Sequence, residues 1–412
     1  MKLSGIETHE HLQAIKKGMV MNMNNKNWVS VWGNAISIAE HHPEAYAKYI
    51  TLRYPVYIPF AGDTLRFTFD NYCGSEAVTV TRATVSAATS PVYEKMPLAC
   101  PCKKETICDI TFSKNESVTM EAHQTAVSDP VSFPVKKGMT LTVSLYFADF
   151  TLMQSAVLVT GPLSKGFFSL GDQTHADALP MDTTKTTNWF YFLSNIELMT
   201  AEENHTVICY GDSITAGAWP DYLTLLARQN PDNHTAFIRR ATSGSRVLRQ
   251  YECITYDSYG LKGTNRFPHE IPTTGADTVI IQQGINDIIH PIGIETNPFR
   301  PMSDLPTAQE LIDGLRWYVE SAHQMGLQVY LGTLLPIYGW RTYAPFREEL
   351  KNEVNGWIRS TNEIEGYIDF ATALCGSENP AAFRGEYDSG DHLHPSKAGY
   401  QKMAELIPST LF

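Results

Sequence analysis

Apolar and polar residues alternate one by one over much of the first half of the chain. Clear examples are residues 65–69, 131–135 and 141–147, and polar turn sequences such as 61–63 and 136–138 separate them. A period of two is typical of strands that bury one face. Many short strands of this kind predict an antiparallel β-sandwich, resembling a jelly roll, with its last strand at residues 189–193.

The pattern changes at about residue 204, where apolar runs begin to alternate with longer amphipathic segments. In one of these, Leu311, Leu315, Val319 and Ala322 recur at three- and four-residue spacing, which predicts a helix with one buried face. Strands are predicted near residues 207–210, 236–239, 278–282, 328–333 and 366–370, and helices near 220–228, 307–325, 345–360 and 396–406. This alternation predicts an α/β domain with a parallel sheet covered by helices on both sides.

The chain has 412 residues, which is too long for one ordinary core and suits two domains. We predict a β-sandwich domain over residues 1–203, with a short helical or loose lead-in to about residue 26, and an α/β domain over residues 204–412. The join is expected at the polar segment 200–204.

The balance of charged residues restricts the partners. There are 32 Lys and Arg against 44 Asp and Glu, a formal net charge of −12. Nucleic acids and anionic membranes need a basic face, so we expect neither as a partner and favour neutral substrates. No run approaches the ~20 apolar residues of a membrane span, and charged residues interrupt the first segment where a signal core would lie. We therefore expect a cytoplasmic location.

The cysteines indicate a reducing compartment. All seven are scattered along the chain, as expected for free thiols. Cys100, Cys102 and Cys108 could form a metal clip, but no second pair follows them at a zinc-like spacing. We predict no metal and no organic cofactor.

Four short motifs in the second half follow predicted strands or precede a predicted helix. They are Gly211-Asp212-Ser213, a turn centred on Gly244, Gly284-Ile285-Asn286-Asp287 and Asp391-His392-Leu393-His394. Each alone is an ordinary turn sequence. Open α/β sheets bind ligands at the carboxyl ends of their strands, so the four together indicate a single site at that edge.

The residue types in these motifs suit nucleophilic catalysis. A hydroxyl such as that of Ser213 needs a base beside it, and an imidazole titrates near neutral pH. Asp391 can turn back to hold the ring of His394, three residues later. His392, with Asp388 as its partner, is the rival base. Because adjacent Asp391 and His392 would point in different directions, the spacing favours His394.

These motifs, in this order over residues 204–412, resemble the four blocks of the SGNH (GDSL) hydrolase superfamily. The resemblance implies a flavodoxin-like, three-layer α/β/α fold with a five-stranded parallel sheet. It also implies that Ser213 is the nucleophile, His394 the base and Asp391 the residue that orients it. The oxyanion hole would consist of the backbone N–H groups of Ser213 and Gly244 and the side chain of Asn286.

The whole chain also resembles two-domain bacterial members of the superfamily, several of which are carbohydrate acetylesterases. We therefore expect a serine esterase that removes short acyl groups, acetyl first, from small-molecule or oligosaccharide esters. A general short-chain carboxylesterase, a lysophospholipase and a thioesterase are the enzymatic alternatives. A glycan-binding protein with a drifted hydrolase scaffold is the non-enzymatic one, and a homo-oligomer is a further candidate assembly.

Two segments have no counterpart among the motifs. Residues 253–269 match none of the four blocks and are expected to shape the substrate cleft. Asp172, Gln173 and His175 are polar residues on a predicted loop of the first domain, and this loop is a candidate to reach the cleft.

Overall fold

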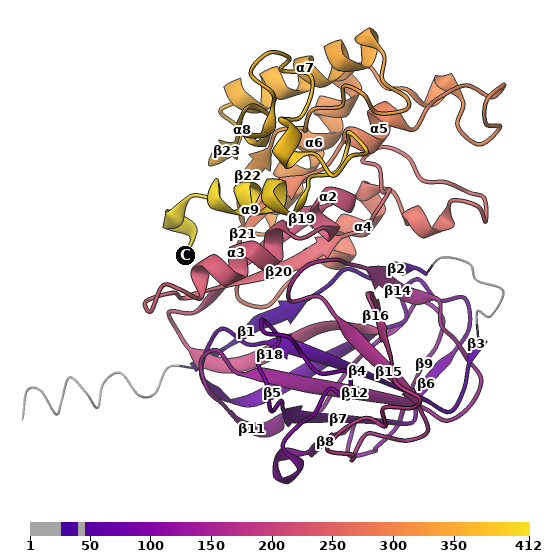
Figure 1. Ribbon diagram of the computed structural model, residues 1–412, viewed down its shortest axis with the longest axis vertical. Coiled ribbons are helices and arrows are strands. Elements are labelled where there is room, and N and C mark those ends of the chain that lie inside the picture. Colours follow the sequence, from indigo (N-terminus) through magenta and orange to yellow (C-terminus); the bar gives the residue numbers. More distant parts are fainter. Residues whose placement is uncertain (1–25, 40–45) are drawn as a thin grey trace, which may run out of the picture.

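The computed structural model describes residues 26–39 and 46–412 and contains two regions (Figure 1). Strands fill the lower region in this view, coloured indigo to magenta, and helices surround a sheet in the upper one. The lead-in predicted for residues 1 to about 26 lies outside the described residues, apart from its last position. Among the described residues, no helix combines the length and apolarity that crossing a membrane requires.

Two antiparallel sheets build the first region. One sheet has the strand order β16-β15-β4-β12-β7-β8. The other has the order β1-β18-β5-β10, and β11 also pairs with β5. Their bounds are β1 Lys26–Gly33, β4 Ile50–Tyr57, β5 Gly62–Asp70, β7 Arg82–Ala87, β8 Cys108–Ile110, β10 Thr125–Val127, β11 Val131–Val135, β12 Thr140–Phe147, β15 Gly166–Leu170, β16 Lys185–Thr187 and β18 Leu193–Ala201. Alternate residues of β5 and apolar residues of β12 meet in one core, among them Phe67, Phe69 and Leu145. The region is therefore antiparallel, as predicted, and the jelly-roll connectivity remains a prediction.

Smaller strands complete this region. They are β2 Ser37–Ile38, β3 Tyr46–Ala47, β6 Val78–Val80, β9 Val118–Met120, β13 Thr151–Leu152, β14 Ser155–Leu158 and β17 Trp189–Tyr191. They form pairs or triplets at the margins of the larger sheets: β13 with β3, β6 with β9, and β14 between β17 and β2.

The predicted last strand at residues 189–193 is wrong. The segment splits into β17 and the start of β18, and Phe192 between them has a positive φ of 61°. β18 is the true last strand, and it runs antiparallel between β1 and β5. The alternation of apolar and polar residues does not reveal β18, because the polar residues Asn195 and Glu197 are buried in it. Ser30 bonds to Asn195, and Arg66 bonds to Glu197. A strand covered on both faces need not alternate apolar with polar residues.

The second region contains a five-stranded parallel sheet in the order β20-β19-β21-β22-β23. The bounds are β19 His205–Gly211, β20 Thr235–Ala241, β21 Ala276–Gln282, β22 Gln328–Gly332 and β23 Gly366–Ile368. All five strands were predicted, because a strand buried on both faces in a parallel sheet is a continuous apolar run. The turn from β18 to β19 falls at residues 202–204.

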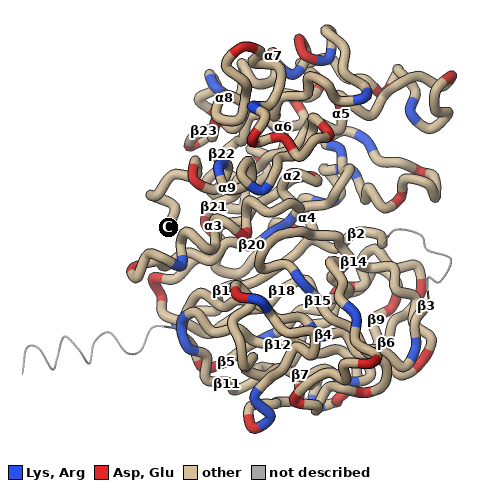
Figure 2. Tube along the Cα trace, viewed as in Figure 1, with Lys and Arg blue, Asp and Glu red and all other residues tan. Residues whose placement is uncertain are grey.

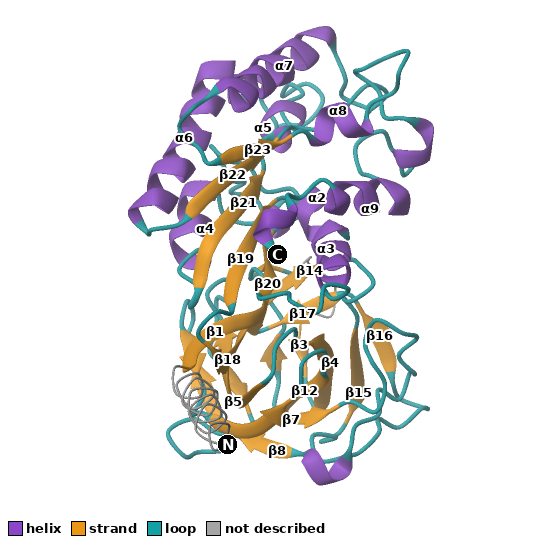
Figure 3. Ribbon diagram, turned by 90° about the vertical axis from the view of Figure 1, so that its left-hand side faces the viewer, coloured by secondary structure: helices purple, strands orange, loops and turns teal. Residues whose placement is uncertain are grey.

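Helices cover both faces of this sheet, as Figure 3 shows: α4 and α6 lie on one side, and α2, α3 and α9 on the other. The bounds are α2 Ser213–Ala216, α3 Trp219–Ala227, α4 Gly263–Glu270, α5 Ile285–Ile289, α6 Ala308–Gln324, α7 Pro345–Ser360, α8 Phe370–Leu374 and α9 Lys397–Glu405. Thr307 and Glu310 form a capping box that fixes the start of α6. Leu311, Leu315 and Val319 are buried on its inner face, as their spacing predicted.

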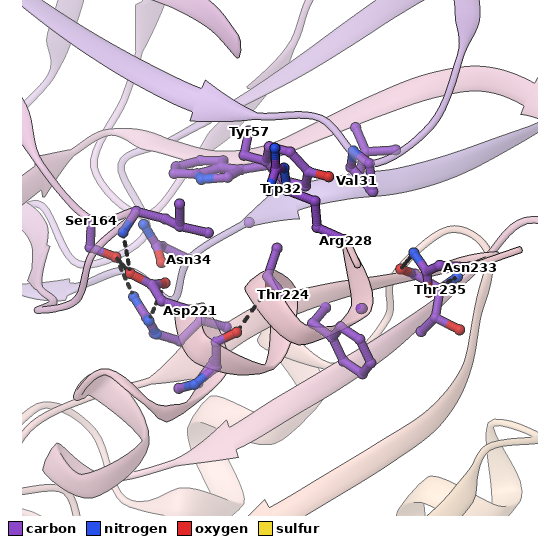
Figure 4. Close-up of a pocket in the computed structure, with 17 residues that line it drawn as sticks. Val31, Trp32, Asn34, Tyr57, Ser164, Asp221, Thr224, Arg228, Asn233 and Thr235 are labelled. Carbon is purple, nitrogen blue, oxygen red and sulfur yellow. Dashed lines mark hydrogen bonds and ion pairs between the residues drawn. The ribbon is translucent and has the colours of Figure 1, made fainter. Parts of the chain in front are cut away.

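The two regions are joined by buried polar contacts. Thr206 at the start of β19 donates to the carbonyl of Ser30 in β1 over 2.7 Å. Asp221 accepts from Arg239 at 2.7 Å and from Ser164 of the first region at 2.9 Å. Ser164, Asp221 and Arg239 border a small cavity of about 40 Å³ between the regions, shown in Figure 4. Because buried charges are costly to leave unpaired, this network favours one fixed orientation of the two regions.

Candidate active site

Ser213 stands where β19 ends and α2 begins. A side chain at Gly211 would lie 2.4 Å from the carbonyl oxygen of Gln282, so only glycine fits at this turn. Asp212 caps α2, since its side chain accepts from the N–H of Ile214 at 3.0 Å. Burial raises the pKa of Asp212 to about 7, although this N–H favours its charged form. Ser213 is the first residue of the helix, so its own N–H has no acceptor within it.

An imidazole and a carboxylate complete a hydrogen-bonded row with Ser213. The Oγ atom of Ser213 lies 2.8 Å from Nε2 of His394, and Nδ1 of His394 lies 2.6 Å from Oδ2 of Asp391. The other oxygen of Asp391 accepts the N–H groups of Leu393 and His394 at 3.0 and 2.8 Å. Burial acts to raise the pKa of Asp391, but the bonds from His394 and from these N–H groups outweigh it and lower the pKa to about 2. Asp391 is therefore ionised at neutral pH and can hold the ring in one orientation.

A second histidine–aspartate pair lies beside the first. Nδ1 of His392 lies 2.6 Å from Oδ2 of Asp388, and His392 has a positive φ of 64°. Its ring packs on Gly339, where a side chain would lie 2.8 Å from the imidazole. Of these two rings, only that of His394 is within hydrogen-bonding distance of Ser213. The structure therefore brings Asp391 and His394, and not the rival pair, to the serine.

The two further residues of the predicted oxyanion hole lie beside each other. Gly244 has a φ of 78° in the turn after β20, a conformation that suits glycine. Asn286, in the first turn of α5, is 3% exposed, and its amide nitrogen donates to the carbonyl of Ser245 at 3.1 Å. The N–H of Thr242 donates to the carbonyl of Gly211 at 3.1 Å, which ties this turn to the end of β19. Asn286 and the Gly244 turn thus meet at the edge of the sheet that carries Ser213.

Sequence reasoning missed two residues that hold this turn in place. Asp287 accepts the N–H groups of Val247 and Leu248 at 2.8 and 3.0 Å, and burial raises its pKa to about 6. Arg266 donates to the hydroxyl of Ser245 at 2.6 Å. The sequence did offer a signal for Asp287, because it is a carboxylate directly after Asn286. Arg266 gave none, because the hydroxyl of Ser245 that it binds lies 21 residues earlier in the chain.

The two segments without a motif differ in where they lie. In segment 253–269, the ring of Tyr259 packs on Gly244, where a side chain would approach it to 2.3 Å. The expectation for the loop of Asp172, Gln173 and His175 is wrong. Asp172 pairs with Arg82, His175 pairs with Asp109, and the carbonyl of Gln173 accepts from Arg53, all within the first region. Cys100, Cys102 and Cys108 are free thiols of that region.

Comparison with known proteins identifies the second region. Residues 209–402 match the GDSL-like lipase/acylhydrolase family. Similar solved structures include a GDSL-like lipase from Bacteroides thetaiotaomicron, 21% identical over 51% of this chain and 88% of that one, with a TM-score of 0.36. An acetylxylan esterase from Geobacillus stearothermophilus is 19% identical over 49% of this chain and 91% of its own, with a TM-score of 0.37. No curated protein matches. Over residues 209–402, the second region is therefore similar to the GDSL-like lipase/acylhydrolase family.

Proposed function

We propose that the protein is a serine esterase that removes acetyl groups from carbohydrates. The observation that carries the proposal is the row from Ser213 through His394 to Asp391, with contacts of 2.8 and 2.6 Å. A hydroxyl bonded to an imidazole, itself oriented by an ionised carboxylate, is the arrangement that activates a serine for attack on an acyl carbonyl.

In the proposed mechanism, Oγ of Ser213 attacks the ester carbonyl while Nε2 of His394 accepts its proton. Negative charge develops on the carbonyl oxygen, and the N–H groups of Ser213 and Gly244 and the amide of Asn286 stabilise it. His394 then returns the proton to the departing alcohol, leaving an acyl-serine. Water, deprotonated by His394, hydrolyses this intermediate and restores Ser213. Asp391 keeps its charge throughout and stabilises the imidazolium.

The preference for short acyl groups rests on the sequence, which contains no long apolar segment of the kind that forms a lid over long acyl chains. A long acyl chain needs an apolar site in which to leave water. The general carboxylesterase, the lysophospholipase and the thioesterase use the same three residues and are the outcomes that the substrate test separates.

The test compares 4-nitrophenyl esters of two to twelve carbons with acetylated oligosaccharides, using the wild type and Ser213→Ala. We expect acetate release from the oligosaccharides and falling kcat/KM with acyl length. Ser213→Ala should lower turnover by about 10⁴-fold or more, since the residues act as a unit. Best turnover of long-chain, lysophospholipid or thioester substrates would contradict the acetylesterase assignment. Unchanged turnover in Ser213→Ala would contradict an esterase at this site.

A further inference from the structure

A large open cavity lies next to the candidate active site. It has a volume of about 920 Å³, within the usual range for ligand pockets, and three loops line it. The first follows β20 and supplies Tyr256 and Tyr259, the second follows α5 and supplies Arg300, and the third follows β22 and supplies Arg341. Thr342 donates to the carbonyl of Ile289 at 3.0 Å, which fixes the third loop to the end of α5.

Two contacts connect this cavity to the proposed catalytic residues. Tyr259, on one wall, packs directly on Gly244 of the proposed oxyanion hole. Gly339, two residues before Arg341, packs on the ring of His392, which is two residues from His394. One wall of the cavity therefore contacts the turn that carries Gly244, and one of the loops that line it contacts the segment that carries His394. An ester held at Ser213 would direct its alcohol part or its acyl part toward this space.

The charge of the lining is opposite to that of the whole chain. Three arginines line the cavity, Arg300, Arg341 and Arg347, against a single acidic residue, Glu295. Figure 2 shows Lys and Arg positions around α5, although the formal net charge of the chain is −12. A concave surface of one charge sign concentrates ligands of the other sign.

Arg300 is the most informative of these residues because its charge is buried without a counter-ion. It is 6% exposed, and its Nε atom has no hydrogen-bond partner. Its closest polar contact is a long one, 3.5 Å from Nη2 to the hydroxyl of Tyr259, and its guanidinium lies 4.3 Å over the ring of Tyr256. Within residues 26–39 and 46–412, no carboxylate lies within ion-pair distance of Arg300 or Arg341.

The other buried arginines show what is missing at Arg300. Arg239, Arg246 and Arg266 each pair with a carboxylate. Arg53, Arg240 and Arg347 each donate to at least two backbone carbonyls. A buried charge without such partners is costly, so its retention points to a ligand that supplies them.

The neighbouring histidine does not supply this charge. His290 is buried, and its ring stacks on Tyr259 with centroids 5.2 Å apart. Burial and the nearby charges of Arg300, Arg246 and Arg341 hold its pKa well below the usual range. His290 is therefore neutral at physiological pH, and the arginines set the electrostatic potential of the cavity.

We infer that this cavity is a subsite for a carboxylate on the sugar part of the substrate, so that the preferred esters are O-acetylated acidic sugars. Arg300 and Arg341 would bind the carboxylate, and the ring of Tyr256, which lies under the guanidinium of Arg300, would hold that guanidinium in place. The inference rests on the proposed esterase function. It revises the expectation of neutral substrates, because the local charge around the site differs from the average over the chain.

The test measures kcat/KM for acetate release from acetylated oligogalacturonate and from acetylated neutral xylo-oligosaccharide. The wild type, Arg300→Gln, Arg341→Gln and the control Arg249→Gln are compared. We expect the wild type to have a higher kcat/KM for the acidic substrate than for the neutral one. In Arg300→Gln and in Arg341→Gln, kcat/KM for the acidic substrate should fall by about 10- to 100-fold. Turnover of 4-nitrophenyl acetate, which has no carboxylate, should stay within about 2-fold of the wild-type value in both variants. Arg249 already pairs with Asp304, so its variant should behave as wild type.

The outcomes separate this inference from the proposed function. No preference for the acidic substrate, or equal losses on acidic and neutral substrates, overturns the carboxylate subsite while leaving an active esterase. Should the buried Arg300→Gln fail to fold, exposed Arg341→Gln decides the question. Should no ester be turned over, calorimetric binding of unesterified oligogalacturonate against xylo-oligosaccharide tests the subsite alone. Tighter binding of a sulfated oligosaccharide would overturn the choice of carboxylate.

Discussion

Two histidine–aspartate pairs lie within seven residues of each other and differ in one decisive respect. Asp388 with His392 and Asp391 with His394 each have an Nδ1-to-carboxylate distance of 2.6 Å. Nε2 of His394 lies within hydrogen-bonding distance of Oγ of Ser213, whereas the ring of His392 packs on Gly339. A short contact between imidazole and carboxylate is therefore no sign of catalysis by itself. What the other ring nitrogen contacts decides the role.

The sharpest way to break this comparison is to remove each ring in turn. His394→Ala should lower kcat for 4-nitrophenyl acetate by about 10⁴-fold or more, because Ser213 loses the base that accepts its proton. His392→Ala, the matched control, should change kcat by less than about 5-fold. Circular dichroism and thermal unfolding establish that both variants fold. A loss of equal size in the two variants would show that His392 takes part in the chemistry.

The carboxylates give a second, smaller contrast. Asp391→Asn keeps the shape of the side chain but removes the charge that stabilises the imidazolium, and the loss of kcat expected by analogy with other serine hydrolases is about 10³- to 10⁴-fold. Asp388→Asn should cost little activity, because its histidine does not contact Ser213. Steady-state kinetics with one ester decide between the two. Full activity in Asp391→Asn would remove this residue from the proposed mechanism.

The sequence allowed prediction of the parts of the molecule whose partners are local. Buried parallel strands are apolar runs, and Asp391 lies only three residues from His394, so both could be predicted from neighbouring residues. The bonds from Arg300 to Tyr259 and from Arg266 to Ser245 could not be predicted, because they join residues 41 and 21 positions apart in the chain. The true last strand, β18, was missed because its buried polar side chains are satisfied by partners in other strands and in the second domain. Tertiary contacts of this kind leave no local pattern.

The smallest expected effect concerns stability at acid pH. The pKa of Asp391 is about 2, below the ordinary value near 3.9 that we take for the unfolded chain. Ionised Asp391 therefore stabilises the folded state above pH ~4, and this contribution is lost as the pH falls toward the folded-state pKa. Because the side chain is 40% exposed, solvent screening limits the contribution to about 1 kcal/mol.

Urea unfolding of the wild type and of Asp391→Asn between pH 7 and pH 3 measures this contribution. Asparagine cannot titrate, so the variant should be less stable at pH 7, and about half of the difference should be gone by pH 3, since the unfolded chain takes up its proton first. The same series on Asp388→Asn is the matched control. A difference that stays constant over this range would mean that the hydrogen bonds to Asp391 do not depend on its charge. Its effect on kcat would then be one of ring orientation, and the contrast between the two pairs would be geometric alone.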